Sequence, residues 1–362
     1  MFDFLKKKKC FGLDISDHSI EAVLLSEKKD QITLTGWSRV ILKSGIVKDG
    51  LVIDAEKLAA KIKDLLAKPR EGALNGQMVN LNLPESKIFT HIFGFPETFS
   101  EKQIGDLIEK EIESVVPLKP DELYWDFKII SRQVKEKVVL LAAVEKNIVR
   151  GYLEVLKSAG LKPMVFDLES NAIVSALIKD YKKNEAVMLV DIGARTSIIS
   201  VFNQSGIQST VNIPVAGIEF TQQLSDKLKL SLKEAEIKKR KAGLLTDKKG
   251  DKKVLGVIES ALEPVVSEIS KSVKYFENNN KGKVSRLILT GGSSLLPGLA
   301  EFLSAKINLP VEVGQPWLDL ETKLSRKERS ILPAALGLAL RGLADDCGRT
   351  TDINLLRNID LD

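Results

Sequence analysis

The chain has 362 residues, of which 44% are hydrophobic, 28% charged and 6% aromatic, with a formal net charge of +5. This composition is typical of a globular protein, and the length is sufficient for two lobes that each have a core. The basic clusters lack the interleaved aromatic residues that stack on bases, which argues against nucleic-acid binding. With two cysteines and two histidines, a disulfide framework and zinc chemistry are also disfavoured, and a reducing cytoplasm is the expected compartment.

The first ten residues combine Phe2, Phe4 and Leu5 with four lysines at positions 6–9. They lack the apolar core of a secretory signal, and no apolar run approaches the ~18 residues that span a bilayer. We therefore expect a cytoplasmic protein. This segment is interpreted either as a disordered start or as a short contact with anionic lipid, to which each lysine would add roughly 1 kcal/mol.

The first 75 residues predict strands followed by a helix. Residues 9–25 form two apolar stretches around a polar turn at 16–19, and residues 32–40 alternate like a third strand. In residues 54–66 the apolar side chains follow helical spacing after Asp54, a residue that can cap the helix.

Residues 76–160 predict a separate α+β insertion. Strand-like alternation covers 77–95, and Ser100 with Gln103 three positions later marks the start of an amphipathic helix. A strand pair is predicted at 124–130 and 137–143, and a helix at 147–159 that ends at Gly160.

The second half opens with a pattern that repeats the start of the chain. An apolar strand from residue 186 ends at Asp191 and Gly193, and a second strand follows at 197–202. In the same way, the strand before Asp14 leads through Ser16 into the next strand. Two copies about 180 residues apart predict a duplicated α/β fold. A third segment, residues 287–298, contains a buried strand that runs into Gly291, Gly292 and Ser293.

With these three segments the sequence resembles the actin/Hsp70/sugar-kinase ATPase superfamily, and within it FtsA and, most closely, the type IV pilus assembly protein PilM family. The resemblance covers roughly residues 11–343 and implies a two-lobed, ribonuclease H-like α/β fold with an inserted α+β subdomain. The implied domains are a first lobe, the insertion, a crossover helix, a second lobe and a flexible C-terminal tail. Their respective bounds are 1–75, 76–160, 161–185, 186–343 and 344–362.

The resemblance also implies an ATP site, in which two hairpins clasp the phosphates and a glycine turn borders the adenosine. The residues that match these motifs are Asp14, Ser16, Asp191, Gly193, Arg195, Thr196, Ser197, Gly217, Glu236, Lys239, Gly291, Gly292 and Ser293. Hairpin amides and hydroxyls suit phosphate oxygens, and a glycine at a helix start such as Gly217 can approach an anion closely.

Several of these residues have a second interpretation. Asp14 and Asp191 would hold Mg²⁺ through water, because carboxylates cannot pair directly with phosphate; alternatively each simply caps the end of a strand. Arg195 either neutralises phosphate charge or points to solvent. Glu236 and Lys239 either meet the nucleoside or belong to a charged helix with pairs at i,i+4 spacing.

Hydrolysis requires a residue that orients the attacking water. Glu169, in the segment that matches the crossover, is the candidate base, and a buried cap or a contact between lobes is the alternative. Binding of Mg-ATP is thus expected, with slow or absent turnover.

The expected function is a nucleotide-responsive cytoplasmic platform for a pilus or secretion machine, associated with the inner membrane through a partner. A cell-division protein like FtsA and a small-molecule kinase are the alternatives. The PilM resemblance implies that the partner is an N-terminal peptide of the PilN type. The chain's own Ile353-Asn354-Leu355-Leu356 is similar to that peptide. It is interpreted as an extended segment that docks on the same molecule or on a neighbour, or as a frayed tail.

Overall fold

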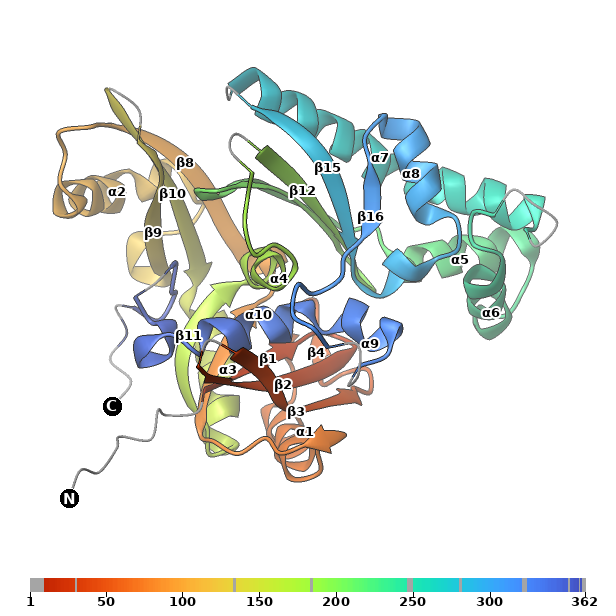
Figure 1. Ribbon diagram of the computed structural model, residues 1–362, viewed down its shortest axis with the longest axis horizontal. Helices are drawn as coiled ribbons and strands as arrows, with labels where there is room; N and C mark the ends of the chain where they lie inside the picture. Colours follow the sequence, from red (N-terminus) through yellow and green to blue (C-terminus); the bar gives the residue numbers. More distant parts are fainter. Residues whose placement is uncertain are drawn as a thin grey trace. The chain divides into compact units, whose positions relative to one another are not determined.

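The computed structural model describes residues 10–29, 31–132, 135–182, 185–245, 250–279, 282–320, 324–350, 352–357 and 359. The predicted lipid contact at residues 2–9 lies outside this part of the chain. The chain divides into two compact units, Met1–Ala176 with Ala334–Asp362, and Leu177–Pro333, which we call unit 1 and unit 2 (Figure 1). Among the described residues, no helix combines the length and apolar character needed to cross a bilayer.

The main sheet of unit 1 has six strands in the order β11-β7-β1-β2-β3-β6. Strand β1 forms an antiparallel hairpin with β2 and pairs in parallel with β7, and β7 pairs in parallel with β11. The bounds are β1 Cys10–Ile15, β2 Ser19–Lys28, β3 Gln31–Ile41, β6 Glu71–Gly72, β7 Met78–Leu83 and β11 Lys162–Leu168; a small separate hairpin joins β4 Val47–Lys48 and β5 Leu51–Val52.

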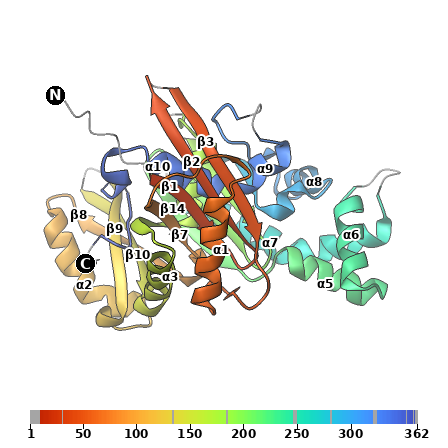
Figure 2. The same cartoon turned by 90° about the horizontal axis from the view of Figure 1, so that it is seen from below.

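Helices cover both faces of this sheet. Helices α1 (Ala55–Ala67) and α3 (Lys146–Ser158) contact each other on one face, and α10 (Pro333–Arg341) lies on the other (Figures 1 and 2). Asp54 caps α1, as the sequence predicts, by accepting a hydrogen bond from the amide of Lys57. Helix α10 is tied to the sheet through Asn80 of β7, whose Nδ2 donates to the carbonyl oxygen of Leu338 at 3.2 Å.

The inserted part of unit 1 is a second sheet with the order β8-β10-β9, covered by α2. Its bounds are β8 Ile88–Pro96, α2 Glu101–Val115, β9 Leu123–Arg132 and β10 Glu136–Glu145, with short 3-10 helices η1 Glu85–Lys87 and η2 Pro120–Glu122. Ser100 and Gln103 form the capping box that begins α2. The predicted insertion, residues 76–160, is too wide, because β7 lies inside the main sheet and α3 packs against α1.

Unit 2 is built on a five-stranded sheet with the order β14-β13-β12-β15-β16. Its strands are β12 Glu185–Ile192, β13 Ser197–Asn203, β14 Gly206–Ile213, β15 Lys283–Thr290 and β16 Val311–Val313; its helices are α5 Gly217–Leu228, α6 Leu232–Ala242, α7 Lys252–Asn279, η3 Gly292–Leu295, α8 Leu299–Ile307 and α9 Arg326–Ile331. A meander of three antiparallel strands with a parallel strand beside the first occurs in both sheets, as β1-β2-β3 with β7 and as β12-β13-β14 with β15. The duplication predicted from the sequence is therefore present.

Three predicted boundaries need correction. Residues 162–168 of the expected crossover helix form strand β11, and the helix, α4 (Glu169–Leu177), begins only at Glu169. Residues 334–343, assigned to the second lobe, belong to unit 1. The tail from residue 344 does not behave as a flexible linker where it is described, since η4 (Asp345–Gly348) forms and residues 353–356 are buried. All three depend on contacts between distant residues, which local sequence patterns do not encode.

Candidate functional site

The first hairpin places Asp14 near the end of β1 and Ser16 in the turn to β2. The Ser16 hydroxyl oxygen accepts hydrogen bonds from the amides of His18 at 3.3 Å and Ser19 at 3.1 Å. The backbone amide of Ser16 donates to the Ser19 carbonyl oxygen at 2.9 Å. In this structure Ser16 therefore shapes the turn itself, as hydroxyl side chains commonly do.

Asp14, which is partly buried, lies in a polar cluster that runs across four strands of unit 1. Asp14 lies opposite Glu21 in the register of the β1–β2 hairpin, and Glu21 forms an ion pair with Arg39 of β3. Asn82 of β7 donates its Nδ2 to Asp14 Oδ1 at 3.1 Å. Burial raises the pKa of Asp14 to about 6, against the opposing hydrogen bond from Asn82 and the charge of Arg39. Burial and the charge of Asp14 raise the pKa of Glu21 to about 7, although the charge of Arg39 and its hydrogen bond lower it.

One atom in this cluster lacks a protein partner. Asn82 is 2% exposed, and its Oδ1 is buried without a hydrogen-bond partner among the described residues. A buried acceptor of this kind is normally satisfied by water or an ion. Asn82 was not among the predicted site residues, although two asparagines at alternate positions of the apolar strand β7, Asn80 and Asn82, are a readable signal.

The second hairpin, in unit 2, holds Asp191 near the end of β12. Thr290 of β15 donates its hydroxyl to Asp191 Oδ1 at 2.8 Å, and the amide of Gly193 closes the turn on the carbonyl oxygen of Thr196 at 3.1 Å. Ser197 donates its hydroxyl to the carbonyl oxygen of Val215 at 2.6 Å. Arg195, at the tip of the turn, is exposed.

The start of α5 and the glycine turn converge on this second hairpin. The amides of Gly217 and Ile218 donate to the carbonyl oxygens of Gly193 and Ala194 at 3.2 and 2.9 Å. The Ser293 hydroxyl donates to Gly193 O at 3.3 Å, and a Cβ at Gly217 would lie 2.7 Å from Ser293 Oγ. Close packing accounts for this glycine, and the first two amides of α5 hold the hairpin in place. Gly291, whose φ is +81°, turns the chain out of β15.

Lys239 and Glu236 form a compact polar cluster between α5 and α6. Lys239 is 5% exposed, and its Nζ donates to Gly217 O, Thr221 Oγ1 and Glu236 Oε2, each at 2.7 Å. Burial opposes the ionisation of Glu236, but hydrogen bonds from Lys239, Thr221 and Arg240 outweigh it and lower the pKa of Glu236 to about 2. All three donors of the ammonium group are thus used within the protein.

We expect Lys239→Met to destabilise unit 2 by about 2–3 kcal/mol, because it removes a buried cation with three hydrogen bonds. Lys238→Met on the same helix is the matched control. Its ammonium group pairs with Asp251 at 3.1 Å on the surface, where such pairs contribute up to about 1 kcal/mol. Urea unfolding followed by circular dichroism measures both variants, and equal losses would contradict a structural role for Lys239.

Glu169 opens α4 in unit 1 and is half-buried. The next residue, Ser170, donates its amide and hydroxyl to the buried carboxylate of Glu85 at 2.7 and 2.8 Å, so Glu85 caps this helix. Asp167, two positions before Glu169, forms an ion pair with Arg341 of α10. Glu85 was not among the predicted site residues, because its hydrogen-bond partner Ser170 lies 85 residues later and the pairing has no local signature in the sequence.

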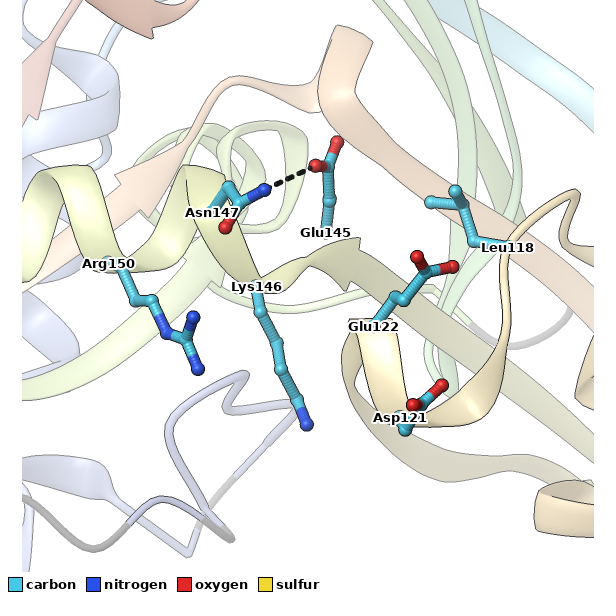
Figure 3. A pocket seen from close by; sticks show the side chains of 7 residues that line it. All are labelled: Leu118, Asp121, Glu122, Glu145, Lys146, Asn147 and Arg150. Atoms are coloured by element: carbon cyan, nitrogen blue, oxygen red, sulfur yellow. Dashed lines mark hydrogen bonds between the residues drawn. The ribbon is translucent and has the colours of Figure 1, made fainter.

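Unit 1 has a cavity of about 180 Å³ that none of the predicted site residues lines (Figure 3). It is lined by Leu118, Asp121, Glu122, Glu145, Lys146, Asn147 and Arg150, with acidic and basic side chains mixed. Within the described ranges no group of three or more His, Cys, Asp or Glu side chains could hold a metal ion. Any magnesium ion would therefore need water or phosphate for most of its coordination.

Comparisons with known proteins agree with this architecture. A family model described as type IV pilus assembly protein PilM matches residues 12–343. Cell division protein FtsA of Streptococcus pneumoniae serotype 2 (strain D39 / NCTC 7466) is 24% identical over 348 residues, which cover 84% of this chain and 76% of that protein. FtsA of Neisseria meningitidis serogroup B (strain ATCC BAA-335 / MC58) is 30% identical over 185 residues, 44% of each chain.

Solved structures show the same fold. The PilM-PilN type IV pilus biogenesis complex matches with a TM-score of 0.81 at 24% identity, covering 93% of this chain and 99% of that one. MreB 5 of Spiroplasma citri bound to AMPPNP matches with a TM-score of 0.56 at 13% identity, covering 93% and 96%. The predicted two-lobed actin-like fold is thereby confirmed.

Proposed function

The chain belongs to the type IV pilus assembly protein PilM family, and we propose that it is an ATP-binding platform of a type IV pilus or related type II secretion machine. The observation that carries this proposal is the family match over residues 12–343. It is supported by the two sheets of the same design, each with an aspartate, Asp14 or Asp191, on the first strand of its hairpin.

Nucleotide binding would use the residues of each unit as follows. In unit 1, the partly buried Asp14 and the unpartnered Asn82 Oδ1 suit a hydrated cation, because both offer oxygen acceptors. In unit 2, Asp191 would likewise hold a magnesium ion through water, and Gly193, Thr196 and Ser197 would shape the phosphate turn. The magnesium ion, when bound, neutralises phosphate charge. The remaining predicted contacts, at Gly217, Glu236, Lys239, Gly291, Gly292 and Ser293, would border the nucleotide from the same unit.

Turnover is proposed to be slow. Glu169 is the candidate for orienting the attacking water, and it lies at the start of α4 beside Ser170, whose amide donates to the structural carboxylate of Glu85. Nucleotide state would then act mainly as a conformational signal.

The proposed partner is the N-terminal peptide of an inner-membrane protein of the PilN type. This proposal is supported by the similarity to the PilM-PilN complex. The chain would act in the cytoplasm and reach the inner membrane through that partner. A cell-division role like that of FtsA is the second candidate, because the FtsA of Streptococcus pneumoniae covers 84% of the chain.

The experiment that tests the proposal measures coupling between the two ligands. A labelled N-terminal peptide of the PilN-type protein from the same organism is titrated with the full chain, with and without saturating Mg-ATP. We expect the affinity to change by about 5–150-fold, the range of typical coupling free energies, and ATP affinity to change by the same factor when peptide is present. The same titration in EDTA is the control. An affinity that is identical in all conditions would refute a nucleotide-responsive platform, and absence of binding would refute the partner.

A further inference from the structure

Residues 352–357, which we call the docked segment, are packed against the rest of unit 1. Ile353, Asn354, Leu355 and Leu356 are consecutive, and each is at most 2% exposed. The sequence predicts an extended segment at residues 353–356, but residues 355–357 form a turn. The Leu355 amide donates a backbone hydrogen bond to the carbonyl oxygen of Phe166 in β11, at 3.0 Å. The segment is therefore held mainly by its side chains and by polar groups around it.

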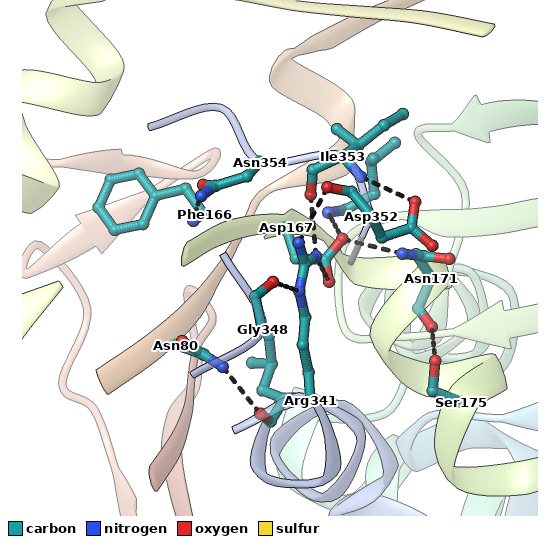
Figure 4. A network of polar contacts seen from close by, with 12 residues as sticks. Asn80, Phe166, Asp167, Asn171, Ser175, Arg341, Gly348, Asp352, Ile353 and Asn354 are labelled. Atoms are coloured by element: carbon teal, nitrogen blue, oxygen red, sulfur yellow. Dashed lines mark hydrogen bonds and ion pairs between the residues drawn. The ribbon is translucent and has the colours of Figure 1, made fainter. Parts of the chain in front are cut away.

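Every polar atom of the Asn354 side chain has a hydrogen-bond partner. Figure 4 shows Asn354 beside one of these partners, Phe166. The Oδ1 of Asn354 accepts from the amide of Phe166 at 3.1 Å and from that of Leu356 at 3.0 Å. Its Nδ2 donates to the carbonyl oxygens of Met164 and Arg349, both at 3.3 Å. An amide side chain has two acceptor sites and two donors, so all are satisfied. Neither aspartate nor leucine could replace it without leaving buried groups unpaired.

Charges of unit 1 complement both ends of the docked segment. Lys128 of β9 pairs with Asp352 at 2.6 Å. Asp126, also on β9, accepts from the backbone amide of Asn354 at 2.8 Å and pairs with Arg357 at 3.1 Å. Arg341 donates to the carbonyl oxygens of Ile353 and Asp352 at 2.8 and 3.1 Å. The surface thus selects an acidic residue before the apolar stretch and a basic one after it.

This surface is formed by the edges of two different sheets. Strand β11 is the outer strand of the six-stranded sheet, and β9 is an outer strand of the inserted sheet. Outer strands have unused backbone groups on one side, which makes them common sites for peptide docking. A short segment that is joined to unit 1 through η4 covers both edges.

We propose that these edges, with Arg341, form a peptide-binding surface, and that the docked segment is an internal ligand that a partner peptide of the same Asp-Ile-Asn-Leu-Leu-Arg chemistry must displace. This deepens the proposed function and rests on it only for the identity of the partner. A tethered ligand acts at an effective concentration on the order of millimolar. It would therefore compete with a micromolar peptide and lower the apparent affinity by more than tenfold.

The test uses the full chain and a labelled synthetic peptide of residues 350–359. We expect the Asn354→Ala chain to bind this peptide at least tenfold more tightly than the natural chain, because its own segment competes less well. Asn279→Ala is the matched control, since Asn279 is exposed on α7 of unit 2, and it should bind like the natural chain. A peptide in which alanine replaces Asn354 should bind at least tenfold more weakly to the Asn354→Ala chain.

A second measurement does not depend on any variant. In the natural chain, saturating peptide should speed hydrogen exchange at the amides of Asn354, Leu355 and Leu356, because their own partners are taken by the peptide. Unchanged exchange at saturation would overturn the proposal, and so would equal peptide affinity in the natural and Asn354→Ala chains.

The failure of the internal ligand and the failure of the proposed partner can be told apart. If the peptide of residues 350–359 binds and a PilN-type peptide does not, the surface stands and the proposed partner falls. If a PilN-type peptide binds the natural and Asn354→Ala chains equally, the partner stands and the internal ligand falls.

Discussion

Replacing Gly337 by alanine is expected to destabilise unit 1 by about 3 kcal/mol or more. An alanine Cβ at this position of α10 would lie 1.7 Å from the carbonyl oxygen of Ala172 in α4. The neighbouring atom belongs to a helix backbone, so relief requires that the two helices move apart, and overpacking of this kind costs about 1–3 kcal/mol or more. The higher helix propensity of alanine offsets at most about 1 kcal/mol.

Gly256→Ala is the control for that prediction. Gly256 lies in α7 of unit 2, and outside its own helix no atom of the described residues lies within 4 Å of the position that its Cβ would take. Here only helix propensity changes, and a gain of about 0.5–1 kcal/mol is expected. The midpoint temperature of thermal unfolding should fall for Gly337→Ala and rise for Gly256→Ala. Similar shifts for both would mean that α10 and α4 do not pack as closely as described.

Arg341→Met is expected to cost about 3–5 kcal/mol, because it removes one partner of a buried ion pair. The side chains of Arg341 and Asp167 are 8% and 3% exposed, and Arg341 also donates to the carbonyl oxygens of Gly348, Asp352 and Ile353 (Figure 4). The double variant with Asp167→Asn should recover part of the loss, since it removes the charge that is left unpaired. Denaturant unfolding of the single and double variants measures this difference, and no recovery would contradict the ion-pair explanation.

The loss in Arg341→Met should also depend on pH. Burial already raises the pKa of Asp167, and the charge of Arg341 opposes that rise. Without Arg341 the folded-state pKa moves higher still, so the folded protein retains a proton that the unfolded chain releases above about pH 4. The destabilisation should therefore grow as the pH rises from the folded-state pKa of Asp167 in the natural chain to the higher pKa in the variant. A loss that is independent of pH between 5 and 8 would show that Asp167 does not titrate in the variant.

The parts of the fold that could be predicted are those with strong local patterns. The β1–β2 hairpin around Ser16, the capping box at Ser100 and the repeated motif at Asp191 each occupy a few consecutive residues. Their role is set by alternation, capping chemistry or glycine geometry, all of which are visible in sequence. The duplication was visible for the same reason.

The parts that could not be predicted depend on distant contacts. Strand β7 reads like the strands that follow it, yet it pairs with β1 and β11 rather than with the inserted sheet. At the candidate site, the sequence indicates Gly217 as a small residue at a helix start and Lys239 as a charged residue of the next helix. It does not show that the lysine ammonium group is saturated by its own neighbours, because that depends on how α5 and α6 pack.

The central claim is that the chain binds Mg-ATP through its two hairpin aspartates, and isothermal titration calorimetry of the full chain tests it most directly. We expect binding that weakens in EDTA. It should also weaken by about 1–3 kcal/mol for each of Asp14→Asn and Asp191→Asn, as for the loss of a contact between charged groups. Asp226→Asn, at an exposed position of α5, is the matched control and should bind like the natural chain. The account is contradicted if the natural chain shows no heat of binding, or if the double variant binds Mg-ATP with unchanged affinity.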